Sequence, residues 1–378
     1  MMTNIRKYSI ALCLFLACGA TEVEAQLSVG YYKFKNGAEY TGQLKRRRPN
    51  GMGRTVYPNG DLYEGEYVKG KRDGEGTMML NIGERYIGHW SQDMKQGKGT
   101  YYFTNNNMYN GSWEADCQEG EGVMEYFNGD RYSGEWSRNK RNGRGKYVWA
   151  GGAVYEGEWK NDLKDGDGKM VWEDGSYYEG QWKNGFRHGK GTFVYTNGDK
   201  YTGEWKDDVQ DGKGVYFFHN GERYEGEYMN SERTGRGVYT YPNGDMYEGE
   251  FKNGKQDGNG TFKWTNGAVY TGTWKDNERN GYGKYVWANG DVYEGQWKNN
   301  MAEGSGKLEM SDGSVYTGDF LRGREHGKGI IKQKDGSVFE GEFKNGKKDG
   351  EFVEKDAYGK ITRKGTFKNG RLLDDKKM

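Results

Sequence analysis

Residues 155–175 read YEGEWKNDLKDGDGKMVWEDG, and a unit of this kind recurs along the chain at a fixed spacing. The unit starts with Tyr-x-Gly, and each start lies 23 residues after the one before, without insertion or deletion. Thirteen units start with a tyrosine, and Phe339 starts a fourteenth. The thirteen are Tyr40, Tyr63, Tyr86, Tyr109, Tyr132, Tyr155, Tyr178, Tyr201, Tyr224, Tyr247, Tyr270, Tyr293 and Tyr316. A regular period of this length indicates a repeat architecture.

Glycine marks the same places in almost every repeat when the first residue of each repeat is numbered position 1. Positions 3 and 12 are glycine in all fourteen repeats. Position 14 is glycine except at Phe352, and position 21 is glycine except at Asn106. A flexible linker would not keep glycine in register, so these glycines indicate a structural requirement. At positions 3 and 14 we expect the missing side chain to leave a slot for neighbouring rings.

The twelve tryptophans fall at only two positions of the repeat. Position 5 is aromatic except at Leu44, and it holds Trp90, Trp113, Trp136, Trp159, Trp182, Trp205, Trp274 and Trp297. Position 18 holds Trp149, Trp172, Trp264 and Trp287. Only these two columns can therefore face a surface that accommodates so large a side chain.

The alternation of residues predicts one β-hairpin in each repeat. Positions 1, 3 and 5 read tyrosine, glycine and aromatic with polar residues between them, and positions 14, 16 and 18 read glycine, aromatic and aromatic in the same alternation. A period of two is typical of a half-buried strand. Positions 7 to 11 hold turn residues, and Asn-Gly pairs such as Asn197-Gly198 follow the second strand. Asn-Gly supplies the positive φ of tight turns, and Asn106 is the next-best residue for it.

The unit at residues 155–175 resembles the MORN (membrane occupation and recognition nexus) repeat. The resemblance implies an all-β fold, in which hairpins pack side by side into an elongated, twisted, single-layer antiparallel meander. It covers residues 28–367, and together with the two termini the sequence suggests four parts. These are a signal peptide (1–25), an N-terminal half-repeat cap (26–39), fourteen repeats (40–361), and a degenerate C-terminal cap with a charged tail (362–378). MORN repeats often accompany a catalytic domain, but no stretch of 100 residues is left to house one.

Charge and composition predict a binding protein rather than an enzyme. The 57 basic and 56 acidic residues give a net charge of +1, which predicts no nucleic-acid partner. The histidines, His89, His188, His219 and His326, lie in different repeats, so we expect no metal site, no cofactor and no catalysis. Acidic residues are frequent at position 4, and they read as a solvated ladder that faces basic neighbours.

The N-terminus has the order of a secretory signal. Arg6 and Lys7 precede an apolar run over residues 8–19, and Val23-Glu24-Ala25 offers a cleavage site before Gln26. We therefore expect a secreted or cell-envelope protein, periplasmic if bacterial, cleaved after Ala25. Two alternatives remain, a lipoprotein attached at Cys18 and a short buried element of the fold. Cleavage would leave Cys117 as the single cysteine, without a disulfide framework.

Three kinds of partner are compatible with this sequence. A protein partner, or a second copy, fits a single-layer sheet with exposed aromatic surface. An anionic phospholipid or membrane surface would use basic residues at one turn and at position 6, namely Lys45, Arg46, Arg47, Arg48, Lys160, Lys183 and Lys206. A glycan would use exposed tryptophans.

The two aromatic columns differ in how strictly they are kept. Position 18 drifts to Leu80, Met310 and Gln333 towards the ends of the array, whereas position 5 is aromatic in 13 of the 14 repeats. We therefore expect position 5 to be core and position 18 to be partly exposed, which makes Trp149, Trp172, Trp264 and Trp287 candidate partner-binding residues. The alternative is that both columns are core.

Overall fold

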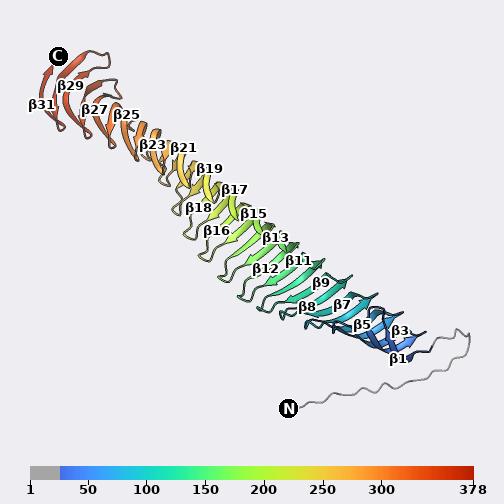
Figure 1. Ribbon diagram of the computed structural model, residues 1–378. Coiled ribbons are helices and arrows are strands. Elements are labelled where there is room, and N and C mark those ends of the chain that lie inside the picture. The colour runs from blue at the N-terminus through green and yellow to red at the C-terminus, as the bar shows by residue number, and fades with distance from the viewer. Residues whose placement is uncertain (1–25) are drawn as a thin grey trace, which may run out of the picture. The chain divides into compact units, whose positions relative to one another are not determined.

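The computed structural model describes residues 26–378, which form 31 β-strands and no helix. The predicted signal peptide, its alternatives and Cys18 lie outside the described residues. The chain divides into two compact units, unit 1 ending at Gly122 and unit 2 spanning Val123–Met378. Figure 1 shows the strands of each unit following one another in chain order. No helix among residues 26–378 is long and apolar enough to cross a membrane.

Unit 1 contains β1 (Ser28–Lys33), β2 (Glu39–Lys45), β3 (Arg48–Val56), β4 (Leu62–Val68), β5 (Lys71–Met79), β6 (Arg85–Ser91), β7 (Met94–Tyr102) and β8 (Met108–Glu114). The division between the units falls within β9 (Cys117–Glu125). Unit 2 contains β10 (Arg131–Ser137), β11 (Lys140–Val148), β12 (Val154–Lys160), β13 (Leu163–Val171), β14 (Tyr177–Lys183), β15 (Phe186–Val194), β16 (Lys200–Lys206), β17 (Val209–Phe217), β18 (Arg223–Met229), β19 (Glu232–Thr240), β20 (Met246–Lys252), β21 (Lys255–Lys263), β22 (Val269–Lys275), β23 (Glu278–Val286), β24 (Val292–Lys298), β25 (Met301–Glu309), β26 (Val315–Leu321), β27 (Arg324–Lys332), β28 (Val338–Lys344), β29 (Lys347–Lys355), β30 (Ile361–Lys368) and β31 (Arg371–Lys377).

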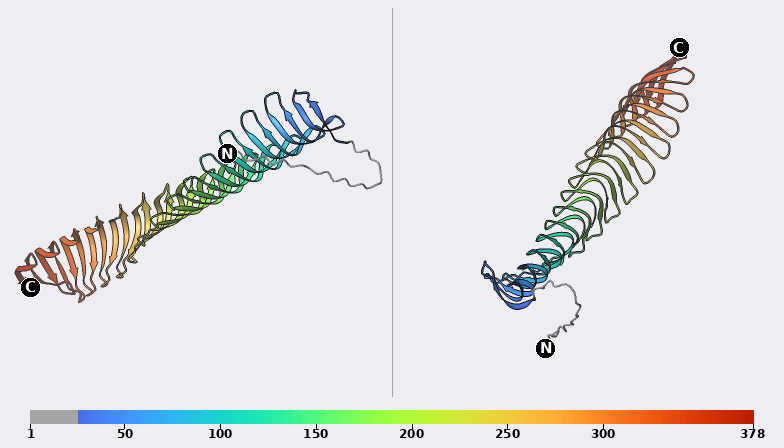
Figure 2. Two further views of the ribbon diagram at one scale, coloured as in Figure 1. Left: turned by 90° about the horizontal axis from the view of Figure 1, so that it is seen from below. Right: turned by 90° about the vertical axis from the view of Figure 1, so that its right-hand side faces the viewer.

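Each unit is a single-layer antiparallel meander, as the repeat pattern predicts. In unit 1, β1 to β8 pair antiparallel in chain order. In unit 2, β10 to β31 pair in the same way, as at the β11–β12 and β12–β13 ladders. The views in Figure 2 show the strands of unit 2 side by side in one layer. A sheet of one layer has no second layer to cover it, so burial must come from its own side chains.

The hairpin turn is shorter than the sequence pattern predicts. Positions 7 to 11 read as a loop, but the turn consists of positions 7 and 8 alone. In the repeat that starts at Tyr155 these are Asn161 and Asp162, with φ of 49° and 71°, as a two-residue hairpin turn requires. The remaining loop residues belong to β13, where a bulge absorbs them opposite Glu158. Gly166 at position 12, with φ of 105°, makes this bulge possible.

The second turn of the repeat agrees with the prediction. Gly198 has φ of 90°, and its amide donates a hydrogen bond to the carbonyl of Tyr195. Asn106 takes the place of this glycine in its own repeat with φ of 62°. Its left-handed backbone is the reason that asparagine is accepted there.

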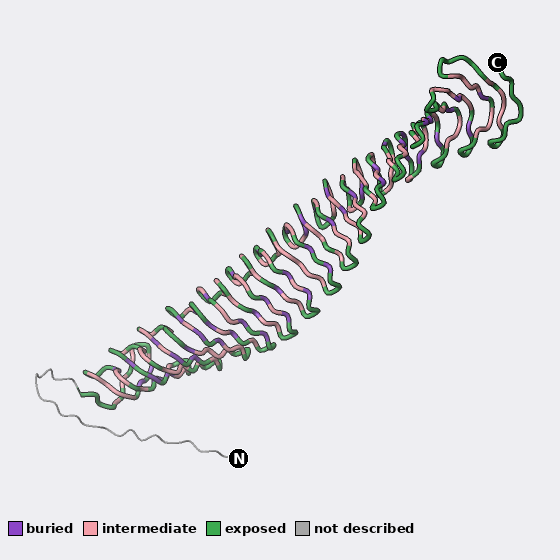
Figure 3. Tube along the Cα trace, turned by 180° about the vertical axis from the view of Figure 1, so that it is seen from behind, coloured by how far each residue is buried: buried purple, intermediate pink, exposed green. Residues whose placement is uncertain are grey.

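Buried residues recur at the same place in successive strands, and exposed residues lie in the turns and along the strands between them (Figure 3). The fully buried side chains are mainly the position-1 tyrosines, and the position-5 rings are nearly as buried. At the N-terminal end, β1 pairs antiparallel with β2. At the C-terminal end, the segment predicted as a charged tail forms β31, and all seven residues of this strand are exposed.

Candidate binding surfaces

The tyrosines at position 1 and the rings at position 5 form one continuous layer within each unit. In unit 2, Tyr155 is fully buried and lies edge-to-face against Trp159 and Trp182, with ring centroids 5.1 and 5.5 Å apart. Its hydroxyl donates to the carbonyl of Glu158 at 2.9 Å, and the indole N–H of Trp182 donates to the carbonyl of Gly168 at 3.1 Å. Each position-5 ring thus joins two successive repeats, which is a core role.

Burial in this layer suppresses ionisation of the tyrosines. Desolvation raises the pKa of Tyr40, Tyr224 and Tyr270 to about 12, because a phenolate loses its hydration inside the layer.

The glycines at positions 3 and 14 allow this layer to form. Gly157 and Gly168 are cross-strand partners, and a Cβ on Gly157 would lie 2.4 Å from the Cα of Gly168. A Cβ on Gly168 would lie 2.4 Å from the hydroxyl oxygen of Tyr155. The tyrosine ring therefore rests directly on the glycine pair, as the expected slot requires. In the last repeat Phe352 replaces glycine and stacks on Phe339 at 5.4 Å.

The four position-18 tryptophans lie in unit 2 and are only partly covered. Trp149, Trp172 and Trp264 are half-buried and Trp287 is 38% exposed, whereas Trp205 at position 5 is 4% exposed. The two columns therefore differ in burial in the direction that the sequence indicates.

Rings at positions 16 and 18 alternate to form an aromatic ladder in unit 2. Its successive ring centroids are 4.4–6.1 Å apart. The ladder consists of Trp172, Phe193, Tyr195, Tyr216, Phe218, Tyr239, Tyr241, Phe262, Trp264, Tyr285 and Trp287. Trp149 belongs to a shorter run with Tyr147 and Tyr126, because position 16 of its neighbouring repeat is Met170. The structure thus brings three of the four candidate tryptophans into one surface.

The candidate lipid-binding residues belong to two different units. Lys45, Arg46, Arg47 and Arg48 surround the β2–β3 turn of unit 1, where the arginines are exposed and Lys45 is half-buried. Lys160, Lys183 and Lys206 are exposed in unit 2, each as the last residue of its strand.

A column of cations at position 10 covers the core rings, and the sequence pattern did not reveal it. The guanidinium of Arg141 lies 4.3 Å from the ring centre of Trp159, and it donates to the carboxylate and the carbonyl of Asp162 at 3.1 and 2.9 Å. Such cation–π contacts are favourable when partly desolvated. The column consists of Arg72, Lys95, Arg141, Lys164, Arg187, Arg233, Arg279 and Lys348.

Lys164 is the exceptional member of this column. Its ammonium lies 3.9 Å from the centre of the Trp182 ring, and burial lowers its pKa to about 8. The residue that corresponds to Asp162 in the next repeat is Gly185, so the carboxylate that faces Arg141 has no equivalent here. Desolvation without that carboxylate disfavours the charged amine.

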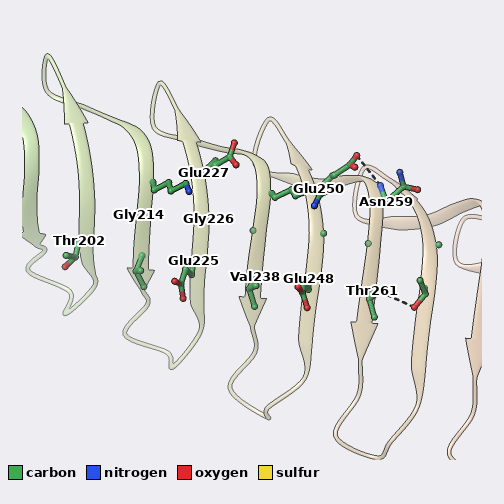
Figure 4. A pocket seen from close by; sticks show the side chains of 18 residues that line it. Thr202, Gly214, Glu225, Gly226, Glu227, Val238, Glu248, Glu250, Asn259 and Thr261 are labelled. Atoms are coloured by element: carbon green, nitrogen blue, oxygen red, sulfur yellow. Dashed lines mark hydrogen bonds between the residues drawn. The ribbon is translucent and has the colours of Figure 1, made fainter.

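Unit 2 also has an open groove of about 910 Å³ along the glycine row. Its floor is the backbone of glycines such as Gly226 and Gly237. In Figure 4, Glu225, Val238, Glu248 and Thr261 lie in one row across neighbouring strands. Glu227 and Glu250 lie nearer the β18–β19 and β20–β21 turns. The groove therefore has a peptide floor and mixed, partly acidic walls.

A family model of the MORN repeat matches fourteen consecutive segments, from residues 40–62 to residues 339–351. The chain belongs to the MORN repeat family. Its described part is a scaffold of tandem hairpins, and no curated protein sequence matches the chain.

Solved structures offer only distant likenesses to this MORN array. The TCP10 domain of Danio rerio CPAP in complex with a STIL peptide is 13% identical, with 81% of this chain and 100% of that chain covered, at a TM-score of 0.20. The TCP domain of Drosophila melanogaster SAS-4 with a proline-rich motif of Ana2 is 12% identical, with 58% and 99% covered, at 0.22. Virginiamycin B lyase from Staphylococcus aureus is 10% identical, with 82% and 92% covered, at 0.13. TM-scores this low establish no shared fold or function.

The acids at position 4 of the MORN repeat have a structural role that the sequence reading missed. They were expected to form a solvated ladder, but they accept backbone hydrogen bonds at the bulge. The amide of Arg144 donates to the carboxylate of Glu135 at 2.8 Å, and the amide of Lys190 donates to the side-chain oxygen of Gln181 at 2.9 Å. Glutamine at this position in some repeats could have indicated the role, since glutamine keeps the accepting oxygen without the charge.

The MORN units show no arrangement of groups for metal chemistry. Among the described residues, no three or more histidine, cysteine, aspartate and glutamate side chains gather as metal ligands would. The histidines stand apart: His219 pairs with Asp199 at 2.9 Å, and His89 with Glu75 at 3.3 Å.

Proposed function

We propose that this MORN array is a non-enzymatic scaffold that binds a protein partner, or a second copy of itself, through the aromatic ladder of unit 2. The observation that carries the proposal is the unbroken run of rings from Trp172 to Trp287, with one side packed on the sheet and the other accessible. Tryptophan and tyrosine in this half-buried state are the residue types that dominate protein interfaces. They are held rigid by their neighbours, which lowers the entropy lost on binding.

Binding to an anionic membrane surface is the alternative favoured by the exposed Lys160, Lys183 and Lys206, and by the basic turn of unit 1. Each of these three lysines is followed by a turn that contains an asparagine or aspartate. In the basic turn of unit 1, Arg46 and Arg47 have no acidic residue next to them in the sequence. Glycan binding on the ladder is a third candidate. We also propose that the protein is exported to the cell envelope or secreted, which determines where its partner would be sought.

The test compares two matched variants of residues 26–378 in pull-downs from native envelope material. One carries Trp172→Ala, Trp264→Ala and Trp287→Ala, and the other carries Lys160→Ala, Lys183→Ala and Lys206→Ala. Loss of a specific partner with the first variant alone supports the proposal. Equal recovery of that partner by wild type and both variants would count against the ladder as the binding surface.

Two further assays separate the alternatives. Sedimentation with vesicles of phosphatidylserine and phosphatidylcholine tests lipid binding, which must weaken with salt if it is electrostatic. A glycan array tests the third candidate with the tryptophan variant as its control.

A further inference from the structure

Arg279 defines how a guanidinium is held on the aromatic side of unit 2. Its guanidinium carbon lies 4.5 Å from the ring centre of Trp297, 5.6 Å from that of Tyr270 and 5.3 Å from that of Tyr285. One of its terminal nitrogens donates to the carbonyl of Asn300 at 2.8 Å. With Trp264 at 5.9 Å, four rings and one carbonyl thus surround the cation.

One repeat further along, the arginine is absent but its surroundings remain. Position 10 is Ala302, and the residues 23 positions after Trp297, Tyr270, Tyr285 and Asn300 are Phe320, Tyr293, Leu308 and Gly323. All four of these residues, together with Ala302, line one cavity of about 560 Å³. Because the methyl group of Ala302 cannot reach over Phe320 as Arg279 reaches over Trp297, the place of the guanidinium is left as a cavity.

Two other repeats of unit 2 without a cation at position 10 fill this place with glutamine. Gln210 and Gln256 are buried there, and their amides donate to the hydroxyls of Tyr195 and Tyr241 at 3.4 and 3.3 Å. Glutamine therefore fills the volume with a neutral polar group.

The cavity also carries negative charge. Glu325, which occupies position 10 of the next repeat, is half-buried and lines the cavity together with Asp291. Arg279 also lines it, but its guanidinium is already engaged by Trp297 and the carbonyl of Asn300. A carboxylate beside an uncovered ring favours a cationic ligand.

We propose that this cavity binds an arginine side chain of a partner protein, in the place that Arg279 occupies one repeat earlier. The inference rests on the proposed protein-binding function for the source of the arginine. Arginine fits better than lysine or choline because the five arginines of the column each donate to a backbone carbonyl at position 8 of the following repeat. Trp287, the last ring of the ladder, lines the same cavity, so a partner on the ladder can reach it.

The test uses acetyl-arginine-amide as the probe and the indole N–H resonances of Trp287 and Trp297 as the readout, with residues 26–378. We expect saturable shifts of both resonances with the probe, and affinity about tenfold weaker for the neutral isostere acetyl-citrulline-amide, which corresponds to about 1.4 kcal/mol. Glu325→Gln should weaken binding of the probe severalfold while the fold is unchanged.

A variant that fills the cavity from within provides the decisive control. Ala302→Arg should abolish the shifts. Gln256→Arg introduces the same residue at position 10 of a repeat where that place is already filled, and it should leave the shifts intact. Shifts of equal size in Ala302→Arg, equal binding of the citrulline probe, or tighter binding of choline than of the arginine probe would each overturn the inference. A different result would separate the two proposals. If the probe still binds but the ladder variant still recovers the protein partner, the proposed function is wrong and the cavity assignment stands.

Discussion

Substitution of a single tryptophan in each aromatic column should separate the core from the binding surface. Trp205 at position 5 is 4% exposed, packs edge-to-face on Tyr178 and Tyr201 at 5.4 and 5.2 Å, and donates its indole N–H to Gly191. We expect Trp205→Ala to cost about 3–5 kcal/mol of unfolding free energy, as for a core tryptophan. Arg187 would in addition lose the ring beneath its guanidinium, 4.5 Å away.

Substitution of Trp264 at position 18 should lower the unfolding free energy by less, because part of the surface of this side chain is already in water. It packs on Phe262 and Tyr285 at 4.4 and 5.1 Å and is half-buried. Partial burial of a large apolar side chain is worth about 1–2 kcal/mol. The Trp264→Ala variant should therefore remain folded and lose partner binding instead.

Native-state hydrogen exchange is the appropriate assay, because repeat arrays unfold locally and one melting temperature would average over them. At about 1.4 kcal/mol for each factor of ten, Trp205→Ala should speed exchange in β15 and β16 by two to three and a half orders of magnitude. Trp264→Ala should speed exchange in β21 and β23 by about five- to thirtyfold. Equal acceleration by the two variants, with partner binding per folded molecule unchanged, would show that both columns are core.

Four further outcomes follow from the same geometry. Deletion of Tyr178–Lys200, one whole repeat, should leave a folded array by circular dichroism, whereas deletion of 12 residues should not, since it removes one strand and reverses the direction of the meander. Because burial raises the pKa of the position-1 tyrosines above the unfolded value near 10, stability should hold below about pH 10 and fall steeply above it; complete ionisation of the tyrosines, beyond the exposed ones such as Tyr31 and Tyr358, before the loss of strand signal would contradict this. Glu135→Gln should be nearly neutral and Glu135→Ala should cost about 1 kcal/mol in urea denaturation, because the amide of Arg144 needs an acceptor and not a charge. N-terminal sequencing of the exported protein should begin at Gln26, and an intact N-terminus in cytoplasmic protein would refute export.

Much of the fold was predictable because the same residue pattern recurs in fourteen repeats. Tyrosine at position 1, glycine at positions 3 and 14 and tryptophan at position 5 identify the buried face and the strand period, and the structure confirms all three. The difference in burial between Trp205 and Trp264 also agrees with how strictly each column is kept.

Features that depend on the bulge were not predictable from alternation. The bulge places residues 165–167 opposite Glu158 alone and leaves Lys164 at position 10 paired with Trp159, so position 10, which the sequence pattern assigned to the turn, belongs to the strand on its aromatic side. For that reason Arg141 covers Trp159, and the carboxylate of Glu135 turns to the backbone. The sequence pattern assigned position 10 to the turn and position 4 to a solvated ladder, so it predicted neither contact.

The last strand determines how unit 2 can meet another chain. Among the described residues β31 pairs with β30 alone, so its outer N–H and C=O groups form an unpaired edge. Such an edge is a template for a strand of another molecule, and natural proteins block it with charge. Five of the seven residues of β31 are charged, all seven are exposed, and Asp374-Asp375-Lys376-Lys377 places opposite signs side by side. A second strand that docked there would have to desolvate these charges. If copies of this protein associate, they should therefore do so through the faces of the sheet and not through this edge.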